Sequence, residues 1–171
     1  MFQNWDNFYL LIGSGAGALI GLMFVVATLT AGLESAGVSQ GAQVYLTPII
    51  FHLAVVVSVS CISAIPGLAA PAVGVLLALC ALPGLAYSLA TTIRICRPGW
   101  DAKPHWSDKW FYGILPAIVY VSLAVAAATS IWGESHKTVY AVAAMMLALL
   151  LIGIRNAWDL ATYIVQHTPR R

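Results

Sequence analysis

The second apolar stretch of the sequence carries the residues whose types and spacing come closest to chemistry inside a membrane. Ser60 and Ser63 follow His52 by eight and eleven residues, and Tyr45 precedes it by seven. On a helix these offsets place the four side chains on one polar face. Such a face could form a polar path that relays protons or contacts a ligand.

The structural alternative is that His52 is hydrogen-bonded to a hydroxyl group or to a carbonyl freed by Pro48 or Pro83. Proton relays in membranes usually pair histidine with a carboxylate, and the stretch around His52 contains no Asp or Glu. We therefore favour the structural interpretation of His52.

A second candidate is a charge cluster near the end of the last apolar stretch. Arg155 and Asp159 are four residues apart, so they can pair on one helix face. Glu34, at the end of the first stretch, is a candidate partner for Arg155. An arginine near a helix end can extend to the lipid headgroups, so we expect anchoring to be the main role of Arg155.

The first apolar stretch carries a packing motif. Gly13, Gly17 and Gly21 are spaced four apart, which leaves one helix face without side chains. Another helix backbone can approach closely on such a face. We expect contact with another helix of the same chain, and self-association is the alternative.

Spacings typical of catalytic, metal or disulfide sites are absent from the sequence. It has no His-Glu-x-x-His and no Cys-x-x-Cys motif. Cys61 and Cys80 lie within apolar stretches and Cys96 lies between basic residues, so we expect three free thiols. We expect no catalytic residue, no metal, no cofactor and no enzymatic activity.

The composition requires lipid, rather than a protein core, as the main environment. Hydrophobic residues make up 61% of the 171 residues and charged residues only 8%, and the mean hydropathy is +0.88. The apolar stretches are long enough to cross about 30 Å of hydrocarbon as helices, and they lack the alternation typical of barrel strands. We predict an all-α, polytopic transmembrane bundle with about five spans in a single domain, residues 1–171. The spans are expected at about 8–32, 43–65, 69–93, 111–132 and 138–164.

The positive residues predict the orientation. With five spans, one side of the membrane receives nearly all of the lysines and arginines, and the other receives only Lys137. Positive residues are retained in the cytoplasm, so the N-terminus is expected outside and the C-terminus inside. The residues on the expected cytoplasmic side are Arg94, Arg97, Lys103, Lys109, Arg155, Arg170 and Arg171. The net charge of +2 is explained by this orientation, and we expect no nucleic-acid partner.

The largest segment outside the spans is residues 94–110, which alternates tryptophan with charge. Trp100, Trp106 and Trp110 suit a loop that lies along the headgroups, because tryptophan is enriched at the membrane interface. We expect the lipid bilayer to be a partner of this loop. Ile65-Pro-Gly67 predicts a tight reversal that makes the second and third spans a hairpin.

Four segments carry a resemblance to a known family. They are Trp5-Asp-Asn-Phe-Tyr9, the small-residue helix from Gly13 to Val25, Ile65-Pro-Gly67, and Asn156-Ala-Trp-Asp-Leu160. Together they resemble a widespread family of small bacterial inner-membrane proteins of unknown function, some of which are loosely labelled modulators of a membrane-anchored AAA protease. Members of that family resemble one another in carrying a basic residue soon after the first span. The sequence departs from this pattern, because residues 34–43 contain no basic residue.

The resemblance implies a bacterial inner membrane and an accessory or regulatory role, and it identifies no binding residue. Our first hypothesis is accordingly a subunit that acts through protein or lipid contacts, by way of the glycine face and the tryptophan-rich loop. The alternative is a small homo-oligomeric channel or carrier with His52, Ser60 and Ser63 along its path.

Overall fold

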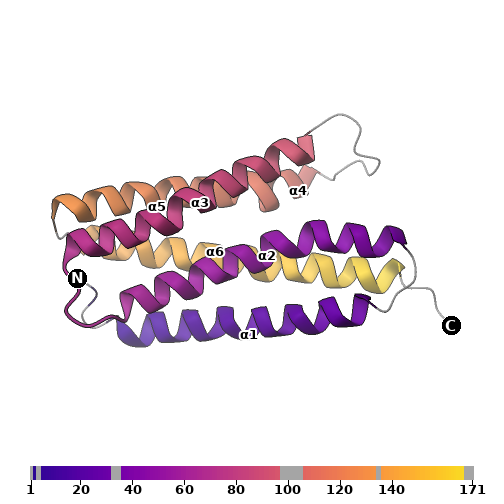
Figure 1. The fold of residues 1–171 in the computed structure, drawn as a ribbon, viewed down its shortest axis with the longest axis horizontal. Helices are drawn as coiled ribbons and strands as arrows, with labels where there is room; N and C mark the ends of the chain where they lie inside the picture. The colour runs from indigo at the N-terminus through magenta and orange to yellow at the C-terminus, as the bar shows by residue number, and fades with distance from the viewer. Residues whose placement is uncertain (1, 3–4, 32–35, 97–105, 134–135, 168–171) are drawn as a thin grey trace.

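Long apolar helices make up nearly all of the described chain, as the sequence predicts for an all-α transmembrane bundle (Figure 1). The computed structural model describes residues 2, 5–31, 36–96, 106–133 and 136–167. The helices are α1 (Asp6–Ala31), α2 (Ala36–Ser63), α3 (Ala70–Cys96), α4 (Trp106–Lys109), the π-helix η1 (Trp110–Ile114), α5 (Leu115–Trp132) and α6 (His136–His167).

Five of these segments are long and apolar enough to cross a membrane. Their outward faces also carry large hydrophobic side chains: Leu10, Leu79, Val125 and Leu151 are all more than half exposed. Water would disfavour so much exposed apolar surface, whereas lipid does not. The fold therefore indicates a multi-pass membrane protein.

The helices pack as two antiparallel pairs joined by the last helix. The α1–α2 and α3–α5 contacts are the most extensive, and α6 packs against α2 and α5 and more lightly against α1. Helix α2 runs obliquely through the bundle in Figure 1, with its C-terminal part beside α1. Different parts of α2 consequently face different helices.

A tight turn joins α2 to α3. The Ala64 and Ile65 amides donate to the Ser60 and Ile62 carbonyl oxygens at 3.1 and 3.2 Å, which closes α2. Gly67 then adopts φ +71°, a left-handed conformation that glycine takes without steric cost. We call the end of the bundle that contains this turn and Phe2 the turn end. The opposite end, where α3 ends, α4 begins and α6 ends, is called the loop end.

The structure changes the expected limits of the segment 94–110. Helix α3 extends to Cys96, and residues 106–114 continue as α4 and η1 into α5. Both ends of the expected interfacial loop are therefore helical. Its central part, with Trp100, lies outside the described residues.

Large side chains fill the interior. Tyr9, Leu53, Tyr120, Leu123 and Met146 are fully buried. They come from α1, α2, α5 and α6, so the core is shared by helices from both pairs. Polar groups inside it must find partners among neighbouring helices, since lipid offers none.

Candidate functional site

His52 lies at the centre of the bundle and is hydrogen-bonded to a hydroxyl group. Its Nδ1 atom is 2.8 Å from the Tyr120 hydroxyl oxygen, which joins α2 to α5. Neither residue has exposed surface. The hydroxyl partner that the sequence offered as one explanation of His52 is therefore Tyr120, 68 residues further along the chain.

Gly84 provides the space that Tyr120 occupies. A Cβ atom at Gly84 would overlap the Tyr120 ring. The Pro83-Gly84 step lies inside α3, and the missing side chain there lets the ring lie against the helix backbone. A close approach of this kind is a common use of glycine in membrane helices.

Aromatic rings surround the other side of His52. Phe51 stacks on Tyr87 with ring centroids 4.6 Å apart, and the centroid of Tyr87 is 6.3 Å from that of His52. The His52 ring is thus held between α3 and α5. Its Nε2 atom is buried and has no hydrogen-bond partner among the described residues.

The predicted polar path is divided in the structure. His52, Ser60 and Ser63 are all buried, at 0%, 5% and 5% exposure. The fully buried Val56 and Val59 lie on α2 between the histidine and the serines. Within the described chain no hydrogen bond connects His52 with either serine, and the Tyr45 side chain lies outside that part.

The two serines belong to a separate polar group at the turn end. Ser60 packs against Gly13 of α1, and the Tyr9 hydroxyl lies near Ser63. None of these hydroxyl groups makes a hydrogen bond of ordinary geometry with a described residue. Tyr9, Ser60 and Ser63 therefore form a cluster of unsatisfied hydroxyls between α1 and α2.

Among the described residues, the glycine face of α1 is covered at one position only. A Cβ at Gly13 would lie 2.9 Å from the Ser60 Cβ, so this glycine permits the α1–α2 contact. Gly17 and Gly21 have no other described heavy atom within 4 Å of their Cβ positions, and both are exposed. The expectation of one continuous contact with another helix of the chain holds at Gly13 and does not hold at Gly17 and Gly21. The physical reason is that Tyr9, Ile12, Ala16 and Met23 form the buried face of α1. Each four-residue step turns about 40° further round the helix, so Gly17 and Gly21 lie away from that face.

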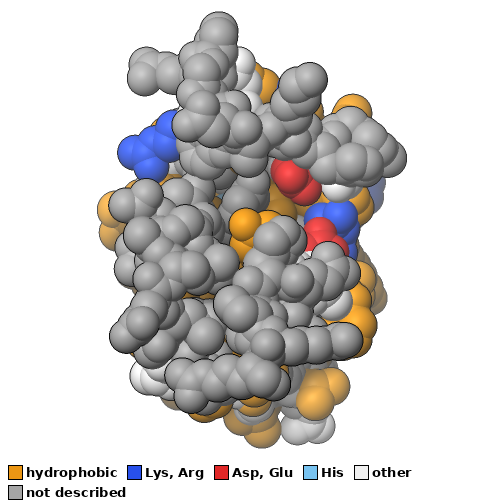
Figure 2. All heavy atoms as spheres, turned by 90° about the vertical axis from the view of Figure 1, so that its right-hand side faces the viewer, with side chains coloured by type: hydrophobic (Ala, Val, Ile, Leu, Met, Phe, Trp, Pro, Cys, Tyr) orange, Lys and Arg blue, Asp and Glu red, His pale blue; other side chains and the backbone are white. Residues whose placement is uncertain are grey.

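The charge cluster at the loop end contains one ion pair among the described residues. Arg155 Nη1 lies 2.8 Å from Asp159 Oδ2, one helical turn away on α6. Glu34, the third expected member, lies outside the described residues. Figure 2 faces this end and shows acidic and basic side chains next to one another at its edge.

Asn156, beside the ion pair, connects α6 to the π-helix. Its side-chain Nδ2 donates to the Phe111 carbonyl oxygen at 3.0 Å. Its backbone carbonyl oxygen accepts from the Tyr112 hydroxyl at 3.1 Å. Arg155 donates to Asn156 Oδ1 at 3.2 Å, and its guanidinium lies 3.8 Å from the centre of the Phe111 ring. This arrangement positions the arginine through a cation–π contact as well as its ion pair.

The backbone explains why Asn156 is needed there. In an α-helix the Phe111 carbonyl would accept from the Leu115 amide, but that amide donates to Trp110 instead. In a π-helix its donor would be residue 116, which is proline and has no N–H. The Asn156 side chain supplies the donor that the backbone lacks.

Sequence reasoning missed three partners that the fold supplies: Tyr120 for His52, Gly84 for Tyr120 and Phe111 for Asn156. A tyrosine in the middle of an apolar span, such as Tyr120, was the available signal, because its hydroxyl must be satisfied in lipid. No sequence signal marks Phe111, because its carbonyl becomes available only through the π-turn.

The residues that the structure describes do not form a metal centre. No group of three or more His, Cys, Asp or Glu residues there could hold a metal ion. Comparisons of the chain with family models, curated proteins and solved structures found no match.

Proposed function

We propose that this chain is an accessory or regulatory subunit of a bacterial inner membrane, and that it acts by docking another membrane protein against α1. The observation that carries the proposal is the open backbone at Gly17 and Gly21. Gly13 contacts Ser60 of α2, whereas Gly17 and Gly21, at the same spacing, contact no other described residue of the chain.

The position of α1 supports this role. Helix α1 lies at the edge of the bundle (Figure 1), and 17% of its span is buried, against 50% for α2. Glycine lowers helix stability by about 1 kcal/mol relative to alanine in water, and its recurrent use in membranes is close helix–helix approach. Leu22 and Phe24, both more than half exposed, flank the open glycines and offer apolar contact area.

The proposed orientation has the N-terminus outside and the C-terminus in the cytoplasm. Among the described basic residues, Arg94, Lys109 and Arg155 belong to the loop end, and Lys137 to the turn end. This distribution supports a cytoplasmic loop end. The resemblance to small inner-membrane proteins agrees with a regulatory role.

Replacement of Gly17 by leucine tests the docking surface. The wild-type chain, gently solubilised, is expected to purify with a stoichiometric membrane-protein partner, and G17L is expected to purify without it. Ala18→Leu is the matched control, because Ala18 is also exposed on α1 but lies about 100° around the helix. Wild-type protein that purifies alone, or G17L that keeps the partner, would contradict the proposal.

A small homo-oligomeric channel or carrier is the second candidate. The observation that favours it is the buried His52 Nε2 without a partner in the described chain. Val56 and Val59 separate His52 from the turn-end hydroxyls, so a path along α2 requires these side chains to move. Proton or ion flux into liposomes that falls on His52→Ala, with folding intact, would support this candidate. Equal flux would exclude it.

A further inference from the structure

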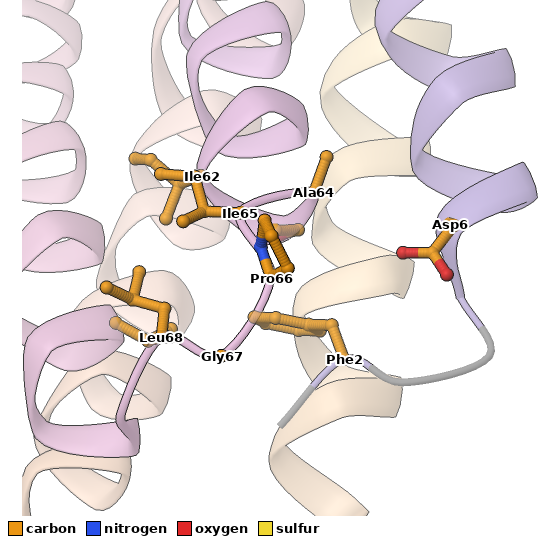
Figure 3. Close-up of a pocket in the computed structure, with 10 residues that line it drawn as sticks. Phe2, Asp6, Ile62, Ala64, Ile65, Pro66, Gly67 and Leu68 are labelled. Carbon is orange, nitrogen blue, oxygen red and sulfur yellow. The ribbon is translucent and has the colours of Figure 1, made fainter.

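A pocket of about 200 Å³ opens at the turn end, between the start of α1 and the α2–α3 turn (Figure 3). Phe2 and Asp6 line it on one side, and residues 62–68 line it on the other. Ser63, which belongs to the cluster with Tyr9 and Ser60, is one of its lining residues. The proposed docking surface at Gly17 and Gly21 is further along α1, so the pocket is a separate feature.

The polar groups of the pocket favour a positive charge. Figure 3 shows the Asp6 carboxylate extending from α1 towards the turn. Ser63 lines the pocket, is 5% exposed and has no hydrogen-bond partner among described residues.

The remaining walls are apolar. They are formed by Phe2, Ile62, Ile65, Pro66 and Leu68. A divalent metal ion takes six or more oxygen ligands, and Asp6 is the one carboxylate that the described lining offers. An ammonium group that carries a short apolar body matches both parts of the pocket. Aromatic rings also attract such cations, and the Phe2 ring lines this pocket.

The described positive charge at this end does not occupy the pocket. Lys137 lines a different groove, between α5 and α6, together with Thr129 and Thr138. Asp6 is therefore the charged side chain that the described part of the chain presents to the pocket.

We propose that this pocket binds a primary ammonium group. Its N–H donors would be shared between the Asp6 carboxylate and the Ser63 hydroxyl, with the attached carbon chain against Phe2 and Leu68. The ammonium belongs either to a small free amine or to the ethanolamine headgroup of a lipid, because the pocket opens where the bundle leaves the membrane.

Calorimetric titration of the purified protein with butylammonium tests the first source, with 1-butanol as the neutral analogue. The wild-type protein is expected to bind butylammonium saturably and butanol not at all. Asp6→Asn is expected to weaken binding about tenfold or more, since it removes a charge-assisted hydrogen bond. Ser63→Ala is expected to weaken it less. Asp108→Asn, an acidic residue at the loop end, is the matched control.

Nanodiscs test the second source. Protein purified from discs that contain equal amounts of phosphatidylethanolamine and phosphatidylcholine is expected to retain the ethanolamine lipid selectively, and Asp6→Asn is expected to lose that preference. Butylammonium binding without lipid preference assigns the site to free amines, and lipid preference assigns it to the headgroup. Two outcomes would overturn the proposal. In the first, the wild-type protein shows neither butylammonium binding nor a preference for the ethanolamine lipid. In the second, Asp6→Asn and Ser63→Ala both behave like the wild type.

Discussion

The Asn156 side chain donates a hydrogen bond of 3.0 Å to the Phe111 carbonyl oxygen and so joins α6 to the π-helix that precedes α5. The carbonyl has no backbone donor, because Leu115 donates to Trp110 and residue 116 is proline. One amide side chain thereby compensates for a proline 40 residues earlier in the chain. The π-helix and Asn156 are therefore coupled, because the carbonyl that the π-helix leaves without a backbone donor is bonded by the Asn156 side chain.

Asn156→Leu should destabilise the bundle by about 1–2 kcal/mol, because it leaves the Phe111 carbonyl unsatisfied away from water. Pro116→Ala should reduce this loss, since it restores a backbone N–H within reach of the π-turn. Unfolding of the two single variants and the double variant in mixed micelles gives the coupling energy. Strictly additive effects would show that proline and asparagine act independently.

Tyr120→Phe should lower the free energy of unfolding by about 1 kcal/mol, because it removes the hydroxyl bonded to His52 and leaves both ring nitrogens buried without a partner. His52→Phe should cost less in the Tyr120→Phe background than alone. Unfolding measurements on the four members of this cycle check the expectation. An unchanged stability of Tyr120→Phe would mean that the hydrogen bond contributes nothing to folding.

Gly84→Ala should destabilise the protein by about 1–3 kcal/mol, because the added methyl group overlaps the Tyr120 ring. Gly15→Ala is the control, since its Cβ position has open space, and it should be neutral or slightly stabilising. Thermal unfolding in detergent compares them. Equal behaviour of the two variants would contradict the close approach of α3 and α5 at Gly84.

Gly13→Leu and Gly17→Leu should differ in their effect on the isolated chain. A side chain at Gly13 meets Ser60, so Gly13→Leu should force α1 from α2 and cost about 1–3 kcal/mol. Gly17→Leu should leave the stability of the purified monomer within about 0.5 kcal/mol, since its surroundings are open. Equal free energies of unfolding for the two variants would contradict the difference in packing between Gly13 and Gly17.

Cys96 should react with a membrane-impermeant maleimide only from the cytoplasmic side. Its side chain is exposed at the end of α3, at the loop end. Labelling in a variant without Cys61 and Cys80 should fail in intact cells and succeed in inverted vesicles. Efficient labelling of intact cells would reverse the proposed orientation.

The sequence by itself determined the features that depend on neighbouring residues. Hydropathy and length predicted the five spans, because crossing a membrane is a property of each segment alone. Ile65-Pro-Gly67 predicted the turn, because proline and a left-handed glycine act locally. The four-residue spacing of Arg155 and Asp159 predicted their ion pair in the same way.

The tertiary structure decided which distant groups meet. A helix face in the sequence specifies direction but not the neighbour, so the partner of His52 could be found only once α5 was placed beside α2. Packing buried the face of α1 that carries Ala16 and Met23, which covered Gly13 and left Gly17 and Gly21 without a described neighbour, although the glycine spacing is identical. The angles at which the helices cross depend on how all five spans pack together, so no local sequence pattern predicts them.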